Sequence, residues 1–197
     1  MFIDKLRILI ADDEALIRMD LREMLQEKGH VVIEARNGRE ALLFAREKHP
    51  DLAIFDVRMP DMDGIAAARA LRREHLAPVL LLTAFSQGET IERAVKAGVY
   101  GYLVKPVREE ELFAAIKVAL SRHHAEGELA AELLLLKGKL EGRKAIDRAK
   151  GILMTVHHFT EDEAYRRLRC YSMEKNTTME KVAAAVIQAA ELRADNK

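Results

Sequence analysis

The chain has 197 residues, and 49% of them are hydrophobic, enough to fill a core. One ordinary domain needs about 100 to 150 residues, so this length predicts two domains, or one domain with an extension. Lys and Arg together number 32, as do Asp and Glu, so the formal net charge is zero. The chain as a whole is therefore not attracted electrostatically to nucleic acid or to a membrane surface. The single cysteine, Cys170, excludes an internal disulfide and is predicted to be a small core residue, and no apolar run reaches the roughly 18 residues of a membrane span, so we expect a cytoplasmic protein without membrane contact.

Up to residue 121, short apolar runs alternate with longer amphipathic stretches that have helical spacing. Gly29 and Gly98 follow two of these stretches at positions where helices commonly end. Near-continuous apolar strands separated by helices are typical of a parallel sheet that is covered on both faces. We therefore predict an α/β domain over residues 1–121 with a doubly wound, five-stranded parallel sheet. Its predicted strands are 7–11, 31–35, 52–56, 78–84 and 100–105.

After residue 121 the pattern becomes helical throughout, and we divide it into a linker, 122–139, and a three-helix unit, 140–197. The linker begins a leucine seam with heptad spacing, which predicts either a short coiled coil or a helix packed on its own chain. The seam consists of Leu129, Leu133, Leu136 and Leu140. Thr160, with Glu163 three residues later, predicts the start of the second helix through a capping box. Thr177 or Thr178 starts the third.

Three carboxylates stand at predicted strand ends, Asp12 and Asp13 after the first strand and Asp56 on the third. They would repel one another without a cation, and a hard divalent ion such as Mg²⁺ prefers such oxygen ligands. The alternative is that Asp12 or Asp13 caps the next helix. Thr83 and Lys105, at the ends of the fourth and fifth strands, could bind phosphoryl oxygens. Together these residues predict phosphoryl transfer to a carboxylate nucleophile.

These motifs resemble the receiver domain of two-component response regulators. The match rests on the acidic pair Asp12 and Asp13, Asp56 in "DVRMPDMDG", the hydroxyl in "LLTA", and "YLVKP", and it covers about 60% of the chain. The resemblance implies that Asp56 accepts a phosphoryl group from a sensor histidine kinase. It also implies that Mg²⁺ binds at Asp13, Asp56 and the backbone carbonyl of Arg58, beside Asp12.

The same resemblance implies that Thr83 and Tyr102 act as coupled switch residues, the hydroxyl moving toward the phosphate as the ring turns inward. Tyr102 could equally be a partly exposed strand residue without that role. The resemblance further implies a cis peptide bond between Lys105 and Pro106.

Basic residues are concentrated in two places in the helical part. Residues 137–150 contain six basic and two acidic residues, and "RRLR" at 166–169 adds three arginines. A concentration of this kind is the electrostatic footprint of a nucleic-acid-binding surface, although ordinary solvated helix faces also carry Lys and Arg.

The segments "RKAIDRAKGILM" and "TEDEAYRRLRCYSMEKNTTMEKVAAAVI" resemble the ANTAR output domain over roughly residues 140 to 192. This resemblance implies a three-helix module that binds RNA stem-loops in leader transcripts and promotes transcription antitermination. Tyr165 could also belong to the core, and Gly151 could permit close approach of a helix or of a nucleotide. The candidate RNA-binding residues are Lys144, Arg148, Lys150, Gly151, Tyr165, Arg166, Arg167 and Arg169.

Two hairpins suggest two RNA-binding modules, so we expect a homodimer through the leucine seam that phosphorylation favours. A DNA-binding output is the main rival, but "MEKVAAAVIQAAEL" is largely alanine and aliphatic and is poorly suited to reading base edges, so no DNA partner is expected. A protein-interaction output is the second rival. We do not expect a classified enzyme, because the histidines beyond residue 121 occur only as adjacent pairs, which make poor metal sites.

Overall fold

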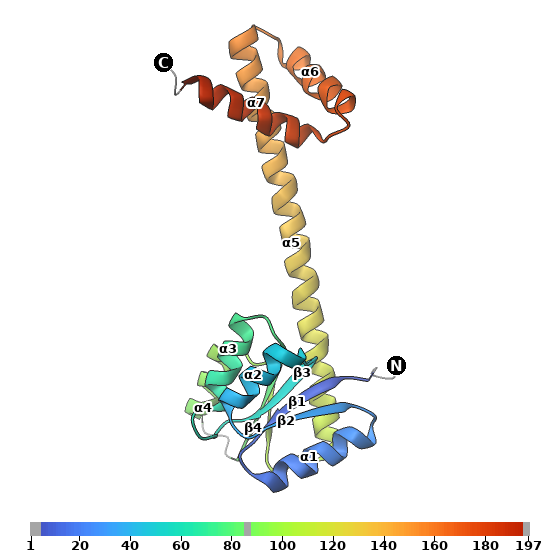
Figure 1. Ribbon diagram of the computed structural model, residues 1–197, viewed down its shortest axis with the longest axis vertical. Helices are drawn as coiled ribbons and strands as arrows, with labels where there is room; N and C mark the ends of the chain where they lie inside the picture. Colours follow the sequence, from blue (N-terminus) through green and yellow to red (C-terminus); the bar gives the residue numbers. More distant parts are fainter. Residues whose placement is uncertain (1–4, 85–87, 195–197) are drawn as a thin grey trace. The chain divides into compact units, whose positions relative to one another are not determined.

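The structure, a computed structural model, describes residues 5–84 and 88–194 (Figure 1). The chain divides into two compact units, Met1–Gly127 and Glu128–Lys197. The elements of the first unit are β1 (Arg7–Ala11), α1 (Ala15–Glu27), β2 (Val31–Ala35), α2 (Gly38–Lys48), β3 (Leu52–Asp56), α3 (Gly64–Arg73), β4 (Val79–Thr83), α4 (Gly88–Ala97) and β5 (Gly101–Val104). Helix α5 (Glu109–His157) begins in the first unit and continues into the second, where α6 (Glu161–Glu174) and α7 (Met179–Ala194) follow.

The five strands form one parallel sheet in the order β2-β1-β3-β4-β5, as the alternating pattern predicted. This is the strand order of flavodoxin-like sheets, whose ligand site lies where the order reverses, between β1 and β3. Strands β1, β2 and β3 have the predicted bounds, whereas β4 and β5 are each one residue shorter than predicted at both ends.

Both faces of the sheet are buried under helices, which explains why the strands are apolar throughout. Leu9, Phe55 and Leu81 pack against α2, α3 and α4 on one face. Ile10 and Ile54 pack on the opposite face against α1 and the first turns of α5 (Figure 1). Alternate residues of each strand therefore fill two separate cores.

Helix ends in the first unit follow local chemistry. Gly29 and Gly98 have φ of 86° and 75° and stand just after α1 and α4, as predicted from the left-handed conformation that glycine adopts readily. Asn37 and Asp63 cap α2 and α3 by accepting hydrogen bonds from the backbone N–H groups of Glu40 and Ala66.

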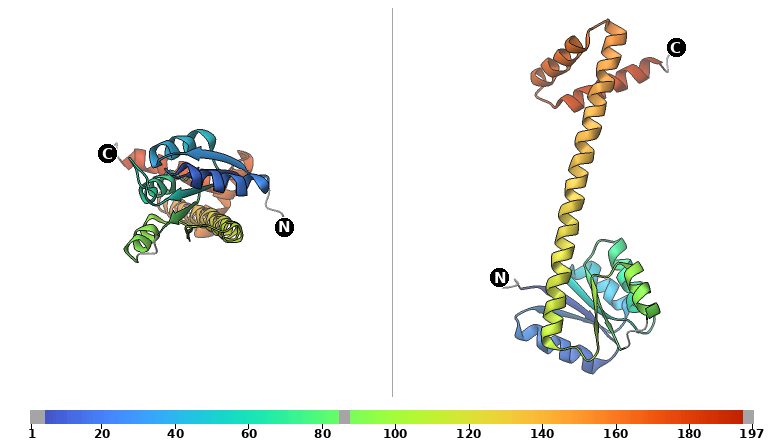
Figure 2. Two further views of the ribbon diagram at one scale, coloured as in Figure 1. Left: turned by 90° about the horizontal axis from the view of Figure 1, so that it is seen from below. Right: turned by 180° about the vertical axis from the view of Figure 1, so that it is seen from behind.

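The second unit is the predicted three-helix assembly, in which α7 crosses the C-terminal part of α5 (Figure 2). Its small core contains Ala149 of α5, Leu168 of α6, and Val182 and Ala183 of α7. The capping box at Thr160 is confirmed, because its hydroxyl accepts from the Glu163 backbone N–H while the Glu163 carboxylate accepts from the Thr160 backbone N–H.

One expectation for this unit is wrong, because Cys170 is exposed and not a core residue. The alternative that Tyr165 belongs to the core is also excluded, since Tyr165 is 45% exposed. The buried side of α6 is formed by Ala164, Leu168 and Ser172, which follow one another at intervals of four residues. Cys170 lies halfway between two of them in sequence and therefore on the opposite side of the helix. Among the described residues, no helix has the length and apolar character needed to span a membrane.

Candidate functional site

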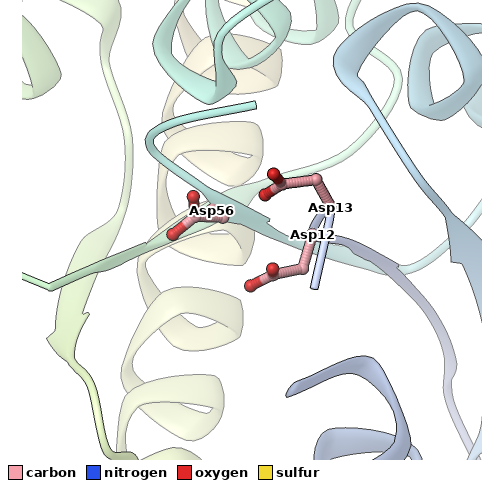
Figure 3. Close-up of side chains that lie close together, drawn as sticks. All are labelled: Asp12, Asp13 and Asp56. Carbon is pink, nitrogen blue, oxygen red and sulfur yellow. The ribbon is translucent and has the colours of Figure 1, made fainter. Parts of the chain in front are cut away.

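The three predicted carboxylates meet at the carboxyl ends of β1 and β3, where the strand order reverses. Asp12 and Asp13 follow β1, and Asp56 is the last residue of β3. One carboxylate oxygen from each lies within 4.8 Å of the others (Figure 3). Asp12 and Asp56 are buried, at 0% and 7% exposure, whereas Asp13 is exposed, so the cluster opens to solvent on the Asp13 side.

Lys105, just after β5, reaches two of these carboxylates. Its Nζ lies 2.6 Å from Asp12 Oδ2 and 2.8 Å from Asp56 Oδ1, and the Lys105 side chain is only 12% exposed. The Lys105–Pro106 peptide bond is cis, as the family resemblance implied. Glu14 adds a more distant carboxylate, 3.8 Å from the same ammonium.

The two buried groups affect each other's ionisation. Burial raises the pKa of Asp56, and the Lys105 ammonium opposes that rise. Burial lowers the pKa of Lys105, but hydrogen bonds to Asp12 and Asp56 outweigh it, and the pKa is raised overall. We therefore regard Lys105 as charged and Asp56 as a carboxylate held in a buried ion pair.

Backbone groups fix the orientation of the two buried carboxylates. Asp56 Oδ2 accepts a hydrogen bond from the Arg58 backbone N–H at 2.9 Å, and Asp12 Oδ1 accepts one from the Glu14 backbone N–H at 2.9 Å. Glu14, not Asp12 or Asp13, is the N-cap of α1, and it makes no side-chain cap hydrogen bond. The alternative that one of the two aspartates serves as the helix cap is therefore wrong.

Glycine allows α3 to begin directly against the Asp56 backbone. A Cβ added to Gly64 would lie 1.9 Å from the Asp56 carbonyl oxygen, so no other residue fits without displacement. The Gly64 backbone N–H also donates to the Val57 carbonyl at 3.0 Å. The loop that presents Asp56 is thereby held closely on both sides.

Thr83 and Tyr102 occupy neighbouring strands. Thr83 is the last residue of β4, is 7% exposed and lies beside Val104 in the sheet. Tyr102, on β5, is 47% exposed, so its ring is largely at the surface.

The acidic cluster fits a divalent cation by its donor set and charge. Three carboxylates face one ammonium group, which leaves excess negative charge in a partly buried place. Carboxylate oxygens are the ligands that Mg²⁺ prefers, usually one or two of them together with water and phosphate oxygens. Within residues 5–84 and 88–194, Asp12, Asp13 and Asp56 are the one group of three or more His, Cys, Asp or Glu residues close enough together to hold a metal ion.

The predicted RNA-binding residues of α5 are engaged by acidic neighbours. Lys144 pairs with Glu141 at 3.2 Å and Arg148 with Glu191 of α7 at 2.8 Å. Lys150 pairs with both Asp147 and Glu161, is only 16% exposed, and has its pKa raised to about 12 chiefly by the hydrogen bond to Glu161. Lys150 therefore links α5 to the start of α6.

The arginines of α6 differ, because Arg166, Arg167 and Arg169 are exposed and form no ion pair with another described residue. Tyr165 lies beside them at the surface. Gly151 is also exposed, and a Cβ there would meet nothing within 4 Å, so close packing of a helix does not explain this glycine.

Sequence reasoning missed Glu14 and Tyr171. The run of three acidic residues after β1 could have indicated Glu14, which lies near Lys105. Tyr171 is 52% exposed and lines a cavity between the helices of the second unit, which no sequence pattern indicates.

Two family models match different parts of this chain. The family model of the response regulator receiver domain matches residues 8–117, and that of the ANTAR domain matches residues 135–187. The receiver domain of NarL from Mycobacterium tuberculosis is 32% identical, with a TM-score of 0.57 over 60% of this chain and 98% of that chain. The chemotaxis protein CheY4 of Vibrio cholerae is 34% identical, with a TM-score of 0.57 over 59% of this chain and 99% of that chain.

Among curated proteins, the transcriptional regulatory protein PdtaR of Mycobacterium tuberculosis is 46% identical over 183 residues, which cover 92% of this chain and 89% of the relative. The probable transcriptional regulator ycf27 of Pyropia yezoensis is 42% identical over 60% of this chain and 49% of its own length. This protein therefore belongs to the response regulators that join a receiver domain to an ANTAR domain, and it is a phosphorylation-controlled regulator whose output binds RNA in transcription antitermination.

Proposed function

We propose that Asp56 is the phosphoacceptor of this regulator and that a sensor histidine kinase is the donor. The observation that carries this proposal is the buried Asp56 carboxylate, held 2.8 Å from the Lys105 ammonium at the carboxyl end of β3. An Asp56 oxygen attacks the phosphorus of a phosphohistidine, the new P–O bond forms, and the P–N bond to the donor imidazole breaks. Lys105 and the Thr83 hydroxyl bind oxygens of the transferred group.

Asp12, Asp13 and Asp56, with the Arg58 backbone carbonyl, are the residues that would hold Mg²⁺. The ion would neutralise negative charge on the phosphoryl oxygens during transfer. Hydrolysis returns the protein to its starting state when water attacks the phosphorus and the P–O bond to Asp56 breaks. We regard the protein as a switch that carries out this chemistry on itself rather than as an enzyme with a separate substrate.

For the output, we propose that phosphorylation moves Thr83 and Tyr102 together and favours a homodimer through the linker, 122–139. The leucine seam supports a partner helix, because Leu129, Leu133, Leu136 and Leu140 are 50% to 58% exposed. Packing on the same chain would have buried them. Two copies of the ANTAR unit, 140–197, would then bind two RNA hairpins with greater avidity than one.

The proposed RNA face combines the α5 residues Lys144, Arg148, Lys150 and Gly151 with Tyr165, Arg166, Arg167 and Arg169 of α6. The pairs of Lys144 and Arg148 are exposed, and such pairs are worth only about 0 to 1 kcal/mol, so phosphate groups could displace the acidic partners. Lys150 is the exception, since two acidic partners hold it between α5 and α6.

The experiment is phosphorylation of the full chain by a small acyl-phosphate donor, followed by intact-mass spectrometry with and without Mg²⁺. We expect one phosphoryl group on the wild type, none on Asp56→Asn, and little on Asp13→Asn. Asp20→Asn, at an exposed position on α1, is the matched control and should behave as the wild type. Full phosphorylation of Asp56→Asn would contradict the assignment.

A further inference from the structure

The second unit contains a cavity of about 310 Å³ between the end of α5, α6 and α7. Leu153, Leu168, Val182 and Val186 give it a hydrocarbon lining. The lining residues with polar side-chain groups are Arg167 and Tyr171, both from α6. Its volume is at the lower end of the roughly 300 to 1,000 Å³ of small-molecule sites, so it suits a compact ligand.

The two polar residues of the cavity wall, Arg167 and Tyr171, each make a contact between a cation and an aromatic ring. The Arg167 guanidinium lies 5.8 Å from the centre of the Phe159 ring, and Phe159 is itself stacked with His157. The Lys175 Nζ lies 5.7 Å from the centre of the Tyr171 ring. Arg167 and Tyr171, the two polar residues of the cavity wall, thus each take part in a contact between a cation and an aromatic ring.

The basic side chains of α6 and its C-terminal end form no ion pair with another described residue. From Ala164 to Lys175, the sequence contains four basic residues and one acidic residue. None of those four basic side chains forms an ion pair with another described residue. On α5, by contrast, Lys144, Arg148 and Lys150 are all paired. Lys137, Lys139 and Arg143 of α5 form no ion pair with another described residue either, but none of the three lines the cavity. Unpaired positive charge next to the cavity is therefore on α6, which forms its wall.

We propose that this cavity receives one unstacked nucleobase from the loop of an RNA hairpin, an inference that rests on the RNA-binding function proposed above. Loop bases that are splayed out are recognised by stacking on aromatic rings or guanidinium planes, with basic residues on the neighbouring phosphates. Tyr171 supplies the ring, the apolar wall of α7 covers the opposite face of the base, and Arg167 and Lys175 bind the flanking phosphates.

A second copy of the protein fits this surface less well. A two-fold symmetric contact brings the same patch of both copies together, so Arg167 and Lys175 of each would face the same cations of the other. Repulsion between like charges opposes that contact, whereas it favours an anionic chain.

The test fills the cavity without touching a basic residue. Ala185 and Ala189 of α7 line the cavity and are exposed, so Ala185→Leu and Ala189→Leu should occupy the space of the base. Ala184 is exposed on the opposite side of α7, and Ala184→Leu is the matched control. Tyr171→Phe keeps the stacking ring, and Tyr171→Ala removes it. Circular dichroism and thermal unfolding of each full-length variant verify that it is folded.

The probe is a pool of RNA hairpins with one stem and a randomised loop, enriched on the wild-type protein with beryllofluoride and Mg²⁺ present. We expect Ala185→Leu and Tyr171→Ala to bind the enriched hairpin roughly 10- to 100-fold more weakly, the range that stacking of one base spans. Ala184→Leu and Tyr171→Phe should bind as the wild type. An abasic substitution at one loop position should weaken the wild type by the same factor and leave Ala185→Leu unaffected.

Equal affinity of the wild type and both cavity-filling variants would overturn the nucleobase site while leaving RNA binding intact. Additive effects of Ala185→Leu and every abasic substitution would also overturn it. A change in oligomeric mass on Ala185→Leu, measured by light scattering, would assign the cavity to a second copy. If the wild type enriches no hairpin over duplex RNA, the RNA-binding function itself fails, and the nucleobase site fails with it.

Discussion

Lys105 Nζ lies 2.8 Å from Asp56 Oδ1, and this contact joins the end of β5 to the end of β3 across the intervening strand β4. The same ammonium contacts Asp12, 93 residues earlier in the sequence. One side chain thereby holds two carboxylates that would otherwise repel each other. The ion pair sets the geometry in which Asp56 meets a phosphoryl donor.

Replacement of Lys105 by methionine should slow phosphorylation of Asp56 by about 100-fold, because removal of one preorganised electrostatic donor typically reduces a rate by about 10² to 10³. The rate is measured with a small acyl-phosphate donor by intact-mass spectrometry. Lys117→Met, at an exposed position of α5, is the control and should react as the wild type. An unchanged rate for Lys105→Met would remove this residue from the mechanism.

Substitution of Gly64 by alanine should lower the free energy of unfolding by about 1 to 3 kcal/mol, the usual effect of overpacking, since the new Cβ would collide with the Asp56 carbonyl oxygen. Gly127→Ala is the opposite case, because a Cβ there meets nothing within 4 Å. It should raise stability by up to about 1 kcal/mol through better helix propensity. Denaturant unfolding measures the free energy of unfolding of both variants. An unchanged value for Gly64→Ala would contradict close packing of the α3 N-terminus against the Asp56 backbone.

Thr160→Ala should lower the stability of the second unit by about 1 kcal/mol, because it removes the hydroxyl that accepts from the Glu163 backbone N–H in the α6 capping box. Hydrogen bonds from the backbone and side chain of Thr160 also hold the pKa of Glu163 below its usual value. Thr155→Ala is the control, since that hydroxyl donates only to the Gly151 carbonyl within α5. Thermal unfolding should distinguish the two variants, and equal stability would argue against the cap.

His30 should make the stability of the protein depend on pH. It is 6% exposed, its Nδ1 accepts from the Leu6 backbone N–H at 3.3 Å, and burial lowers its pKa. Because the unfolded chain then binds a proton at higher pH than the folded chain, stability present at pH 7.5 is lost as pH falls through about 6.5.

Thermal unfolding at pH 7.5 and 5.5 measures this effect. His30→Asn should be less stable at pH 7.5 and lose less on acidification. His124→Asn, on an exposed part of α5, should retain the wild-type dependence. A wild-type slope that persists in His30→Asn would mean that another group titrates.

The sheet was predictable because burial on both faces imposes continuous apolar runs, which fix β1, β2 and β3 to the residue. Positions on α6 were less predictable. Cys170 is hydrophobic and Ser172 is polar, yet Ser172 is the buried one, because the helical phase set by Ala164 and Leu168 decides which side faces the core. The type of a single residue does not show which side of the helix faces the core.

The acidic cluster was predictable because parallel strands deliver their carboxyl ends to one edge of the sheet. The ion pairs were not, because they join residues far apart in sequence, as Lys105 joins Asp12 and Arg148 joins Glu191. The cavity beside Tyr171 has the same origin, since three helices must pack before it exists. Contacts of this kind follow from tertiary structure and leave no local pattern.

Control of RNA binding by Asp56 is tested most directly by titration of a leader-transcript hairpin pair with the full-length protein, with and without beryllofluoride and Mg²⁺. Beryllofluoride should tighten binding by the wild type about 10-fold or more, within the usual range of coupling between two sites, and should have no effect on Asp56→Asn. The same affinity with and without beryllofluoride for the wild type, or an equal gain for Asp56→Asn, would contradict control through this residue.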